Sequence, residues 1–358
     1  MHLNEEEFAR STSRPRTRGH RKLASLGSAA AALLLTVSVG LPVVPAAAES
    51  ADGGAAAPLV EELIDLIREN YILDQRIPNI EQTLREQLAG NAYEGLEAAL
   101  AFSLTRDLRE ASSDLHFGVQ VRPPARASHE AATPPAGAQG GLRRVEVLAG
   151  NVGYLEIAAF VDPAQGAEAV DAAFAELAGT DALLIDVRTS RGGHPAMVAY
   201  LASYLFTGEP FVLSRIYWRN RDETMEFRTR TDLPSPRYPD RPVFVLTSAD
   251  TPSAAEGFSY HLKHFGRATL VGETTAGAAH PIQIFPLGEN FRVAIPTARA
   301  INPRTGTNWE GKGVEPDEDV PAHQALNTAH RCAVEALLEQ ASEPNETDTL
   351  RRILTGLE

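Results

Sequence analysis

Three successive stretches after residue 57 carry hydrophobic side chains at helical spacing. Their apolar positions are Leu59, Leu63, Leu66, Ile67 and Tyr71, then Ile80, Leu84 and Leu88, then Leu96, Leu100, Leu104 and Leu108. Recurrence every three or four residues predicts amphipathic helices, and Pro58 suits the first turn of the first one. Residues 117–121 then alternate apolar and polar side chains, as a short strand does. We therefore predict a small three-helix domain over residues 58–122.

From residue 142 onward, the pattern changes to strands that alternate with helices. The expected strands are at 152–157, 182–187, 242–247, 268–271, 283–286 and 291–295, and the expected helices at 164–177, 195–205, 253–265 and 322–340. Such alternation predicts an α/β core over residues 142–340. The run at 182–187 is nearly all apolar, as in a strand covered on both faces. Residues 123–141, rich in Pro, Ala and Gly, are expected to be a loop or linker, and residues 341–358 a charged, frayed tail.

The first 48 residues have the order of features found in secretory signal peptides. A cationic stretch from Arg14 to Lys22 precedes an apolar run at 24–41 and a small-residue triplet at 46–48. We predict cleavage after Ala48, a flexible linker over residues 49–57 and export of the mature chain. The alternative is a retained membrane anchor, although polar residues interrupt the apolar run and no basic stop-transfer charges follow it. With the leader cleaved, no stable membrane insertion is expected.

The charge balance argues against nucleic acid as a partner. The whole chain has a formal net charge of −14 at pH 7. Six basic and three acidic residues lie in the leader, so 27 of the 33 basic and 44 of the 47 acidic residues remain after cleavage, a net charge of −17. An acidic surface of this kind repels phosphate backbones.

The sequence also lacks the usual signals of redox chemistry and metal binding. The single cysteine, Cys332, cannot form an intramolecular disulfide, and its place on an expected helix face indicates a buried small residue. There is no CxxC or HExxH motif and no glycine-rich phosphate loop after a strand. No metal or organic cofactor is therefore expected.

Ser253 follows a buried strand and begins an expected helix, a position that suits a nucleophile. The first N–H groups of a helix have no partner within it and stabilise nearby negative charge. The N–H of Ala254 can thus point at the oxyanion that forms when the serine Oγ attacks a carbonyl. The same pattern also fits a helix cap, since Ser253 and Glu256 have capping-box spacing. Ser248 and Ser259 are weaker candidates for the nucleophile.

Three further segments are candidates for a site. Gly192 and Gly193 follow a buried strand, where they either expose backbone N–H groups to a ligand or form a tight turn. Residues 272–281 are a turn rich in small residues, and residues 300–317 are a long polar loop with several carboxylates. Each segment is a weak signal by itself.

The order of these motifs along the chain is more specific than any one of them. The shared motifs are Asp114-Leu115-His116, the turn from Asp186-x-Arg188 to Gly192-Gly193, the helix that begins Ser253-Ala-x-Glu256, Gly-Arg-Ala-Thr-Leu-Val-Gly-Glu at 266–273 and Gly-Val-x-Pro-Asp at 313–317. With them the chain resembles the tail-specific (C-terminal processing) peptidase family, in the branch similar to interphotoreceptor retinoid-binding protein. The resemblance covers residues 59–330. It implies a ClpP/crotonase-like α/β core of strand–helix units after the three-helix domain.

The resemblance also implies the site residues. Many relatives pair the nucleophilic serine, here Ser253, with a lysine, and Ala278 occupies the position of that lysine, so the serine–lysine dyad is absent. Other branches, of the tricorn-protease kind, use a histidine base and a glutamate, which match His116 and Glu310 here. An imidazole has a pKa near neutral, and a carboxylate orients it and stabilises its protonated form.

We therefore predict Ser253 as nucleophile, His116 as general base and Glu310 as the carboxylate that orients it. Backbone N–H groups of Gly193 and Ala254 would form the oxyanion hole, and Gly192 would make the turn beside it. The remaining alternatives are His194 and His280 as bases and Glu315 and Asp317 as carboxylates. The chain departs from the resemblance at Gly257, where close relatives often carry a second acidic residue.

The function that follows is an exported serine-type peptidase that cleaves peptide or protein substrates through an acyl-enzyme. Family members with a PDZ domain insert it between the helical segment and the core, and residues 117–150 are too few for one. The core cleft and the helical domain would then select the substrate. The alternatives are a non-catalytic binding protein for apolar ligands, as in the retinoid-binding relatives, and an esterase-type hydrolase. The substrate and the oligomeric state are left open by the sequence.

Overall fold

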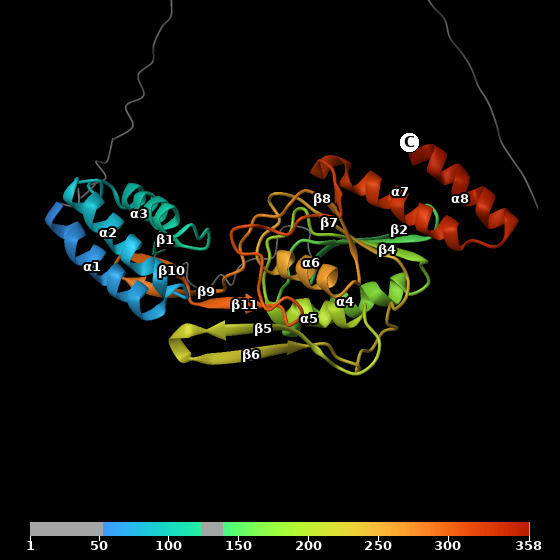
Figure 1. Ribbon diagram of the computed structural model, residues 1–358, viewed down its shortest axis with the longest axis horizontal. Coiled ribbons are helices and arrows are strands. Elements are labelled where there is room, and N and C mark those ends of the chain that lie inside the picture. Colours follow the sequence, from blue (N-terminus) through green and yellow to red (C-terminus); the bar gives the residue numbers. More distant parts are fainter. Residues whose placement is uncertain (1–52, 123–138, 358) are drawn as a thin grey trace, which may run out of the picture. The chain divides into compact units, whose positions relative to one another are not determined.

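The structure is a computed structural model that describes residues 53–122 and 139–357 (Figure 1). The expected signal peptide at 1–48 lies outside the described residues, as do parts of the linker at 49–57 and of the loop at 123–141. Within the described ranges, no helix is both long and apolar enough to cross a membrane. The chain combines a helical N-terminal domain with a mixed α/β core, which is the fold class that the sequence predicts.

The described part of the N-terminal domain contains three helices, two of them close to their predicted positions. They are α1 (Gly53–Asn70), α2 (Ile77–Ala89) and α3 (Glu97–Ser112), with a 3-10 turn at Asp74–Arg76 and strand β1 (Gly118–Val121). The first begins earlier than expected, at Gly53, so residues 53–57 of the expected linker are helical and Pro58 lies inside the helix and not in its first turn. Except for Leu96, which is exposed, the apolar positions that predicted the helices pack against one another, and Leu63, Leu84 and Leu104 are fully buried. Ser113, in the left-handed conformation, ends α3 and turns the chain toward Asp114.

A hairpin from the second half of the chain completes this domain. Strands β9 (Ile282–Leu287) and β10 (Phe291–Pro296) pair with each other, and β10 pairs with β1 in antiparallel register, Val119 opposite Val293. Buried side chains of β10 join the cluster formed by the helices. The sequence predicts both strands but assigns them to the core. Alternation of apolar residues indicates that a segment is a strand, but it does not indicate which other strand that segment pairs with.

The core contains a six-stranded sheet within the described residues, in the order β12-β8-β7-β4-β3-β2. Its strands are β2 (Leu142–Leu148), β3 (Val152–Ile157), β4 (Ala182–Asp186), β7 (Val243–Thr247), β8 (Thr269–Gly272) and β12 (Glu318–Asp319). Neighbouring strands are parallel except β2 and β3, which form an antiparallel pair. Strands β4 and β7 are buried along their whole length, which explains their nearly continuous apolar sequences.

Helices cover both faces of this sheet (Figure 1). One face is covered by α4 (Pro163–Leu177), α5 (Pro195–Ser203) and α6 (Ala254–His264), and the other by α7 (Ala322–Gln340) and α8 (Pro344–Leu357). Side chains of β4 alternate between the two layers: Leu183 and Ile185 pack with the first group of helices, whereas Ala182 and Leu184 pack with the second.

Helix α8 corrects the expectation of a frayed tail at 341–358. Leu350 in α8 is only 5% exposed, and Ile353, Leu354 and Leu357 pack against the same apolar cluster as α7. These residues recur every three or four positions, as one face of a helix requires. Charged and polar residues between them lower the mean hydropathy of the segment, which made this apolar stripe difficult to recognise.

A second antiparallel sheet, β11-β5-β6, was not expected from the sequence. Its strands are β5 (Val212–Trp218), β6 (Glu223–Arg228) and β11 (Ala298–Ile301), and a 3-10 turn at Arg219–Arg221 joins the first two. Leu213, Ile216 and Phe227 of the β5–β6 hairpin are buried, and they line one wall of a cavity in the core.

Candidate active site

A cavity of about 640 Å³ opens at the N-terminus of α6. Its lining includes Ser253 and Ala254 from α6 and its cap, Gly193 from the turn after β4, Ala278 and His280 from the loop after β8, and His116 from the end of the helical domain. Four of the predicted site residues therefore line one cavity. The other two, Gly192 and Glu310, contact residues of this lining.

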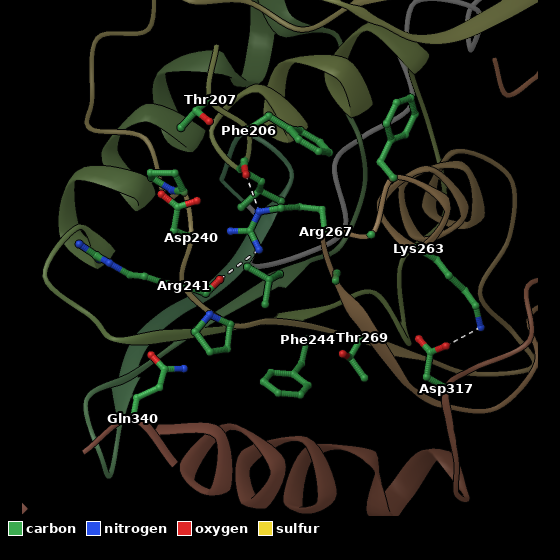
Figure 2. A pocket seen from close by; sticks show the side chains of 17 residues that line it. Phe206, Thr207, Asp240, Arg241, Phe244, Lys263, Arg267, Thr269, Asp317 and Gln340 are labelled. Atoms are coloured by element: carbon green, nitrogen blue, oxygen red, sulfur yellow. Dashed lines mark hydrogen bonds and ion pairs between the residues drawn. The ribbon is translucent and has the colours of Figure 1, made fainter. Parts of the chain in front are cut away.

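A larger cavity of about 730 Å³ lies elsewhere in the core and contains none of the predicted site residues (Figure 2). The guanidinium of Arg267 donates to the backbone carbonyls of Tyr238 at 2.6 Å and Arg241 at 3.0 Å. Lys263 forms an ion pair with Asp317 at 2.8 Å. Because these positive charges are already engaged, we interpret the larger cavity as a surface hollow held open by structural contacts.

Ser253 has a backbone conformation that residues other than glycine rarely adopt. Its φ is 55° and its ψ is −121°, outside the relaxed regions for an L residue. A strained serine between a strand and a helix is also how α/β hydrolases expose their nucleophile. The other two candidates, Ser248 and Ser259, donate their hydroxyls to backbone carbonyls at 2.7 and 2.9 Å. The geometry favours Ser253 over both.

Glu256 joins the strained turn to the loop after β8. Its buried carboxylate accepts hydrogen bonds from the N–H groups of Ser253 (2.8 Å), Gly277 (2.6 Å) and Ala278 (2.9 Å) and from the hydroxyl of Thr275 (2.6 Å). Burial raises the pKa of this carboxyl, and the hydrogen bonds act in the opposite direction. The sequence indicated only the contact between Glu256 and Ser253, because the loop lies some twenty residues further along the chain.

The Gly192–Gly193 turn approaches Ser253 closely. A Cβ on Gly192 would lie 2.9 Å from the Ser253 Cβ and 3.2 Å from the N atom of Ala254. A Cβ on Gly193 would lie 2.1 Å from the carbonyl oxygen of Phe160, and both glycines have positive φ. The N–H groups of Gly193 and Ala254 have no hydrogen-bond acceptor among the described residues. Two backbone donors are thus available beside Ser253.

Asp114 joins two imidazoles at the edge of the cavity. Its Oδ2 lies 2.7 Å from Nδ1 of His280. Its Oδ1 accepts a hydrogen bond from the backbone N–H of His116 at 3.1 Å and lies 3.6 Å from Nδ1 of the His116 imidazole. Burial alone raises the pKa of Asp114, but hydrogen bonds and charge from His116 and His280 outweigh it and lower that pKa below its usual range. Asp114 is therefore ionised. The sequence resemblance included this residue in a motif but gave it no role.

His116 and Glu310, predicted as a pair, have no N–O contact within 4.0 Å in the described structure. Glu310 Oε2 instead accepts the backbone N–H of Ala279 at 2.6 Å and lies 3.5 Å from Nδ1 of His280. Burial raises the pKa of Glu310, and the charge of His280 opposes this. Within the described residues, His116 Nδ1 and Glu310 Oε1 are buried and have no hydrogen-bond partner. The carboxylate closest to His116 is that of Asp114.

Asp114, His280 and Glu310 also offer ligand atoms that lie within 4.8 Å of one another, as a metal site would. The 2.7 Å between Asp114 and His280 is, however, a hydrogen-bond distance. Two ligands held about 2.0–2.2 Å from a tetrahedral zinc ion are further apart than that. We therefore interpret these side chains as a hydrogen-bonded network.

Other candidates from the sequence have contacts of a structural kind. His194 caps α5, because its Nδ1 accepts the backbone N–H of Ala196 at 3.1 Å. Asp317 accepts the backbone N–H of Leu270 at 2.8 Å. In the Asp-x-Arg motif, Arg188 donates to Asp186 at 2.6 Å and to the carbonyl at the start of α7. These contacts hold the sheet, its loops and α7 together.

Comparison with known proteins identifies the family to which the chain is similar. Residues 151–320 match the model of peptidase family S41, and residues 54–146 match the N-terminal domain of peptidase S41 in eukaryotic IRBP. The carboxy-terminal processing protease CtpB of Bacillus subtilis is 30% identical over 170 residues, which are 46% of this chain and 33% of that protein. The carboxy-terminal-processing protease of Bartonella bacilliformis is 29% identical over 176 residues, 47% of this chain and 38% of that protein. The chain thus spans between 33% and 38% of the length of these relatives.

Among solved structures, the photosystem II D1 C-terminal processing protease has a similar fold, with a TM-score of 0.50 and 16% identity over 74% of this chain and 93% of that one. At such low identity the likeness shows the fold alone. The two family models, by contrast, match the helical domain and the core in the order in which they occur here. The chain therefore belongs to peptidase family S41.

Proposed function

We propose that this protein is a serine-type peptidase that hydrolyses peptide bonds through an acyl-enzyme on Ser253. The observation that carries the proposal is the strained Ser253 at the N-terminus of α6, in one cavity with His116 and His280 and beside two available backbone N–H groups. Acyl transfer requires a nucleophile, a base with a near-neutral pKa and donors for the oxyanion. Membership of family S41 supports the same chemistry.

In the proposed reaction, His116 accepts the hydroxyl proton of Ser253 while the serine Oγ attacks the substrate carbonyl. The N–H groups of Gly193 and Ala254 then bind the oxyanion of the tetrahedral intermediate. The protonated imidazole donates its proton to the leaving amine as the peptide bond breaks. Water, deprotonated by the same imidazole, hydrolyses the acyl-enzyme and releases the acid product.

In this proposal, the negative charges of two carboxylates stabilise the protonated imidazole of His116. Asp114 is ionised and closest to His116, and Glu310, the orienting carboxylate expected from the sequence, adds its charge from beside His280. His280 is the alternative base, because its Nδ1 already contacts a carboxylate as in a catalytic triad. No hydrogen bond joins either ring to Ser253 in the described structure. Such contacts often form only when substrate is bound.

Peptides or proteins are the proposed substrates, with cleavage near apolar C-termini. Much of the cavity lining is apolar, and relatives are named carboxy-terminal processing proteases. The net charge of −14 would favour neutral or basic peptides. Residues 1–48 are proposed to direct export.

A non-catalytic protein that holds apolar ligands is the second candidate function. Leu213, Ile216 and Phe227 give the cavity an apolar wall that suits such a ligand. The strain at Ser253 favours catalysis, because a strained residue persists only where its surroundings hold it and such residues gather at active sites. An esterase-type hydrolase would use the same residues on a different acyl group.

Labelling of the purified protein with a fluorophosphonate probe tests the proposal. The wild type and Ser259→Ala, a control on the same helix, should be labelled, whereas Ser253→Ala should not. Removing the base should slow acylation by at least about 10²-fold, so comparison of His116→Ala with His280→Ala identifies it. Labelling that persists in Ser253→Ala would exclude this nucleophile. Cleavage of esters but of no peptide in a library would favour the esterase instead.

A further inference from the structure

Part of the cavity is lined by one face of α6 and by apolar side chains from other elements. Ser253, Gly257 and His261 follow one another at four-residue intervals, so they lie on the same face of the helix, and all three line the cavity. Val198, Leu213, Ile216, Phe227 and Trp309 supply the apolar wall. His261 is thus a polar side chain among apolar ones, and the proposed reaction has no use for it.

Gly257 explains how His261 reaches the cavity. A Cβ on Gly257 would lie 3.0 Å from Cη2 of Trp309 and 3.9 Å from Nε2 of His261. The missing side chain therefore leaves room for the indole and opens a path to the imidazole nitrogen. Helical side chains lean toward the helix N-terminus, so Nε2 lies level with Gly257, one turn or about 5 Å along the helix from Ser253.

Asn302 determines which nitrogen of His261 carries the proton. The Oδ1 of Asn302 accepts the backbone N–H groups of Arg304 at 2.8 Å and Thr305 at 3.2 Å, so its Nδ2 must be the atom 2.9 Å from Nδ1 of His261. Because Nδ2 can only donate, Nδ1 of the imidazole accepts. The proton is therefore on Nε2, which faces the cavity as a hydrogen-bond donor.

The imidazole of His261 also stays uncharged. Burial, followed by the charge of His264, lowers its pKa to about 3. The groups packed against it are Asn302, Tyr260 and Trp309, and none of its contacts in the described structure is with a carboxylate. The indole N–H of Trp309 is already donated to the carbonyl of Ala278 at 3.2 Å. A ligand in this part of the cavity thus meets apolar walls and a neutral donor at Nε2 of His261.

We propose that this pocket binds the side chain on the acyl side of the scissile bond and that His261 makes it selective for tyrosine. An aromatic ring would pack between Trp309 and the β5–β6 wall, and its phenolic oxygen would accept the hydrogen bond from Nε2. Phenylalanine would leave that donor without a partner, and an acidic side chain would lose its hydration and find no positive charge. The inference rests on the proposed peptidase function.

Peptides that differ only at the residue before the scissile bond test this inference. With tyrosine, phenylalanine, leucine or glutamate there, wild-type kcat/KM should be highest for tyrosine, by about tenfold or more over phenylalanine, because an unpaired buried donor is costly. His261→Leu should bring the tyrosine-to-phenylalanine ratio close to one, and His261→Gln, which keeps a donor, should preserve part of it. His264→Leu, on the outer side of the same helix, should leave the ratio unchanged.

The readout is a ratio within each enzyme, so a variant that folds less well still reports on selectivity. A wild type that prefers phenylalanine or leucine, or a ratio that His261→Leu does not change, would overturn the selectivity while the peptidase function stands. A wild type that is neither labelled at Ser253 nor able to cleave any of these peptides would overturn both.

Discussion

The Oδ2 of Asp114 lies 2.7 Å from Nδ1 of His280, although the two residues are 166 positions apart in the chain. Both side chains are buried. Asp114 follows α3 in the helical domain, and His280 belongs to the loop that Glu256 joins by hydrogen bonds to the N-terminus of α6. The contact thus connects the helical domain with the strained serine. It also gives the proposed site an ionised carboxylate that the sequence resemblance had left without a role.

Asp114→Asn should strongly reduce acylation of Ser253 without preventing folding. An amide carries no negative charge, and its NH₂ group can face the imidazole and stabilise the wrong tautomer. In serine proteases the corresponding change costs on the order of 10⁴-fold, and we expect roughly 10²- to 10⁴-fold here. The measurement is the rate of fluorophosphonate labelling, with thermal unfolding as the check on the fold.

Asp181→Asn is a suitable control for that substitution, because Asp181 is exposed and accepts a hydrogen bond from Asn151 at 2.8 Å, away from the cavity. It should be labelled at the wild-type rate. Equal rates for Asp114→Asn and wild type would show that Asp114 only joins the two domains.

Glu310→Gln should leave the protein as stable as wild type, or more stable, at neutral pH. Burial raises the pKa of Glu310 above its usual value, so the folded state holds the proton more tightly than the unfolded state does. The resulting stabilisation is present below the unfolded pKa and is lost as pH rises through the folded pKa. At pH 7, above the unfolded pKa, this buried carboxyl therefore contributes less stability than at low pH, and the variant, which does not titrate, lacks this loss.

Urea unfolding at pH 7 and pH 4 measures the free energy of unfolding of both proteins. The difference in this free energy between variant and wild type should be smaller at pH 4. Acylation by Glu310→Gln should fall by roughly 10²-fold, since a charge that stabilises the imidazolium is removed. A variant that is less stable than wild type at pH 7 with unchanged acylation would make Glu310 a structural residue.

Gly192→Ala should abolish most activity, whereas Gly208→Ala should not. The two glycines have similar positive φ, 73° and 82°, so alanine meets similar backbone strain at both, about 1 kcal/mol. The two positions differ in their surroundings. A Cβ on Gly192 would lie 2.9 Å from the Ser253 Cβ, whereas a Cβ on Gly208 would have no atom within 4 Å. Labelling rates of the two variants, compared at equal folded fraction, separate strain from displacement of the nucleophile. Similar losses in both would count against a close Gly192–Ser253 approach.

Leu350→Ala should lower the free energy of unfolding by about 2–5 kcal/mol, because Leu350 is 5% exposed in the cluster between α7, α8 and the sheet. Leu96→Ala, at a leucine that is 57% exposed, should change it by less than about 0.5 kcal/mol. Chemical denaturation of both variants provides the comparison. A small effect at Leu350 would mean that α8 adds little to the fold.

Much of the secondary structure could be predicted from the sequence, because hydrophobic periodicity and turn residues act within one element. The predicted strand at 152–157 coincides with β3, and the helix expected at 322–340 coincides with α7. Ser253 was recognisable for the same reason, since the strand, the turn and the helix start are consecutive in the chain. The amphipathic stripe of α8 was equally local, and only its high content of polar residues obscured it.

The sequence by itself thus determined the helical domain, the α/β core and the position of Ser253 at a helix start. Only the tertiary structure decided that β10 pairs with β1, that Glu310 lies beside His280 and not beside His116, and that β5 and β6 form a wall of the cavity. The physical reason is that these contacts join segments far apart in the chain. Local periodicity carries no information about which distant side chain will be packed alongside.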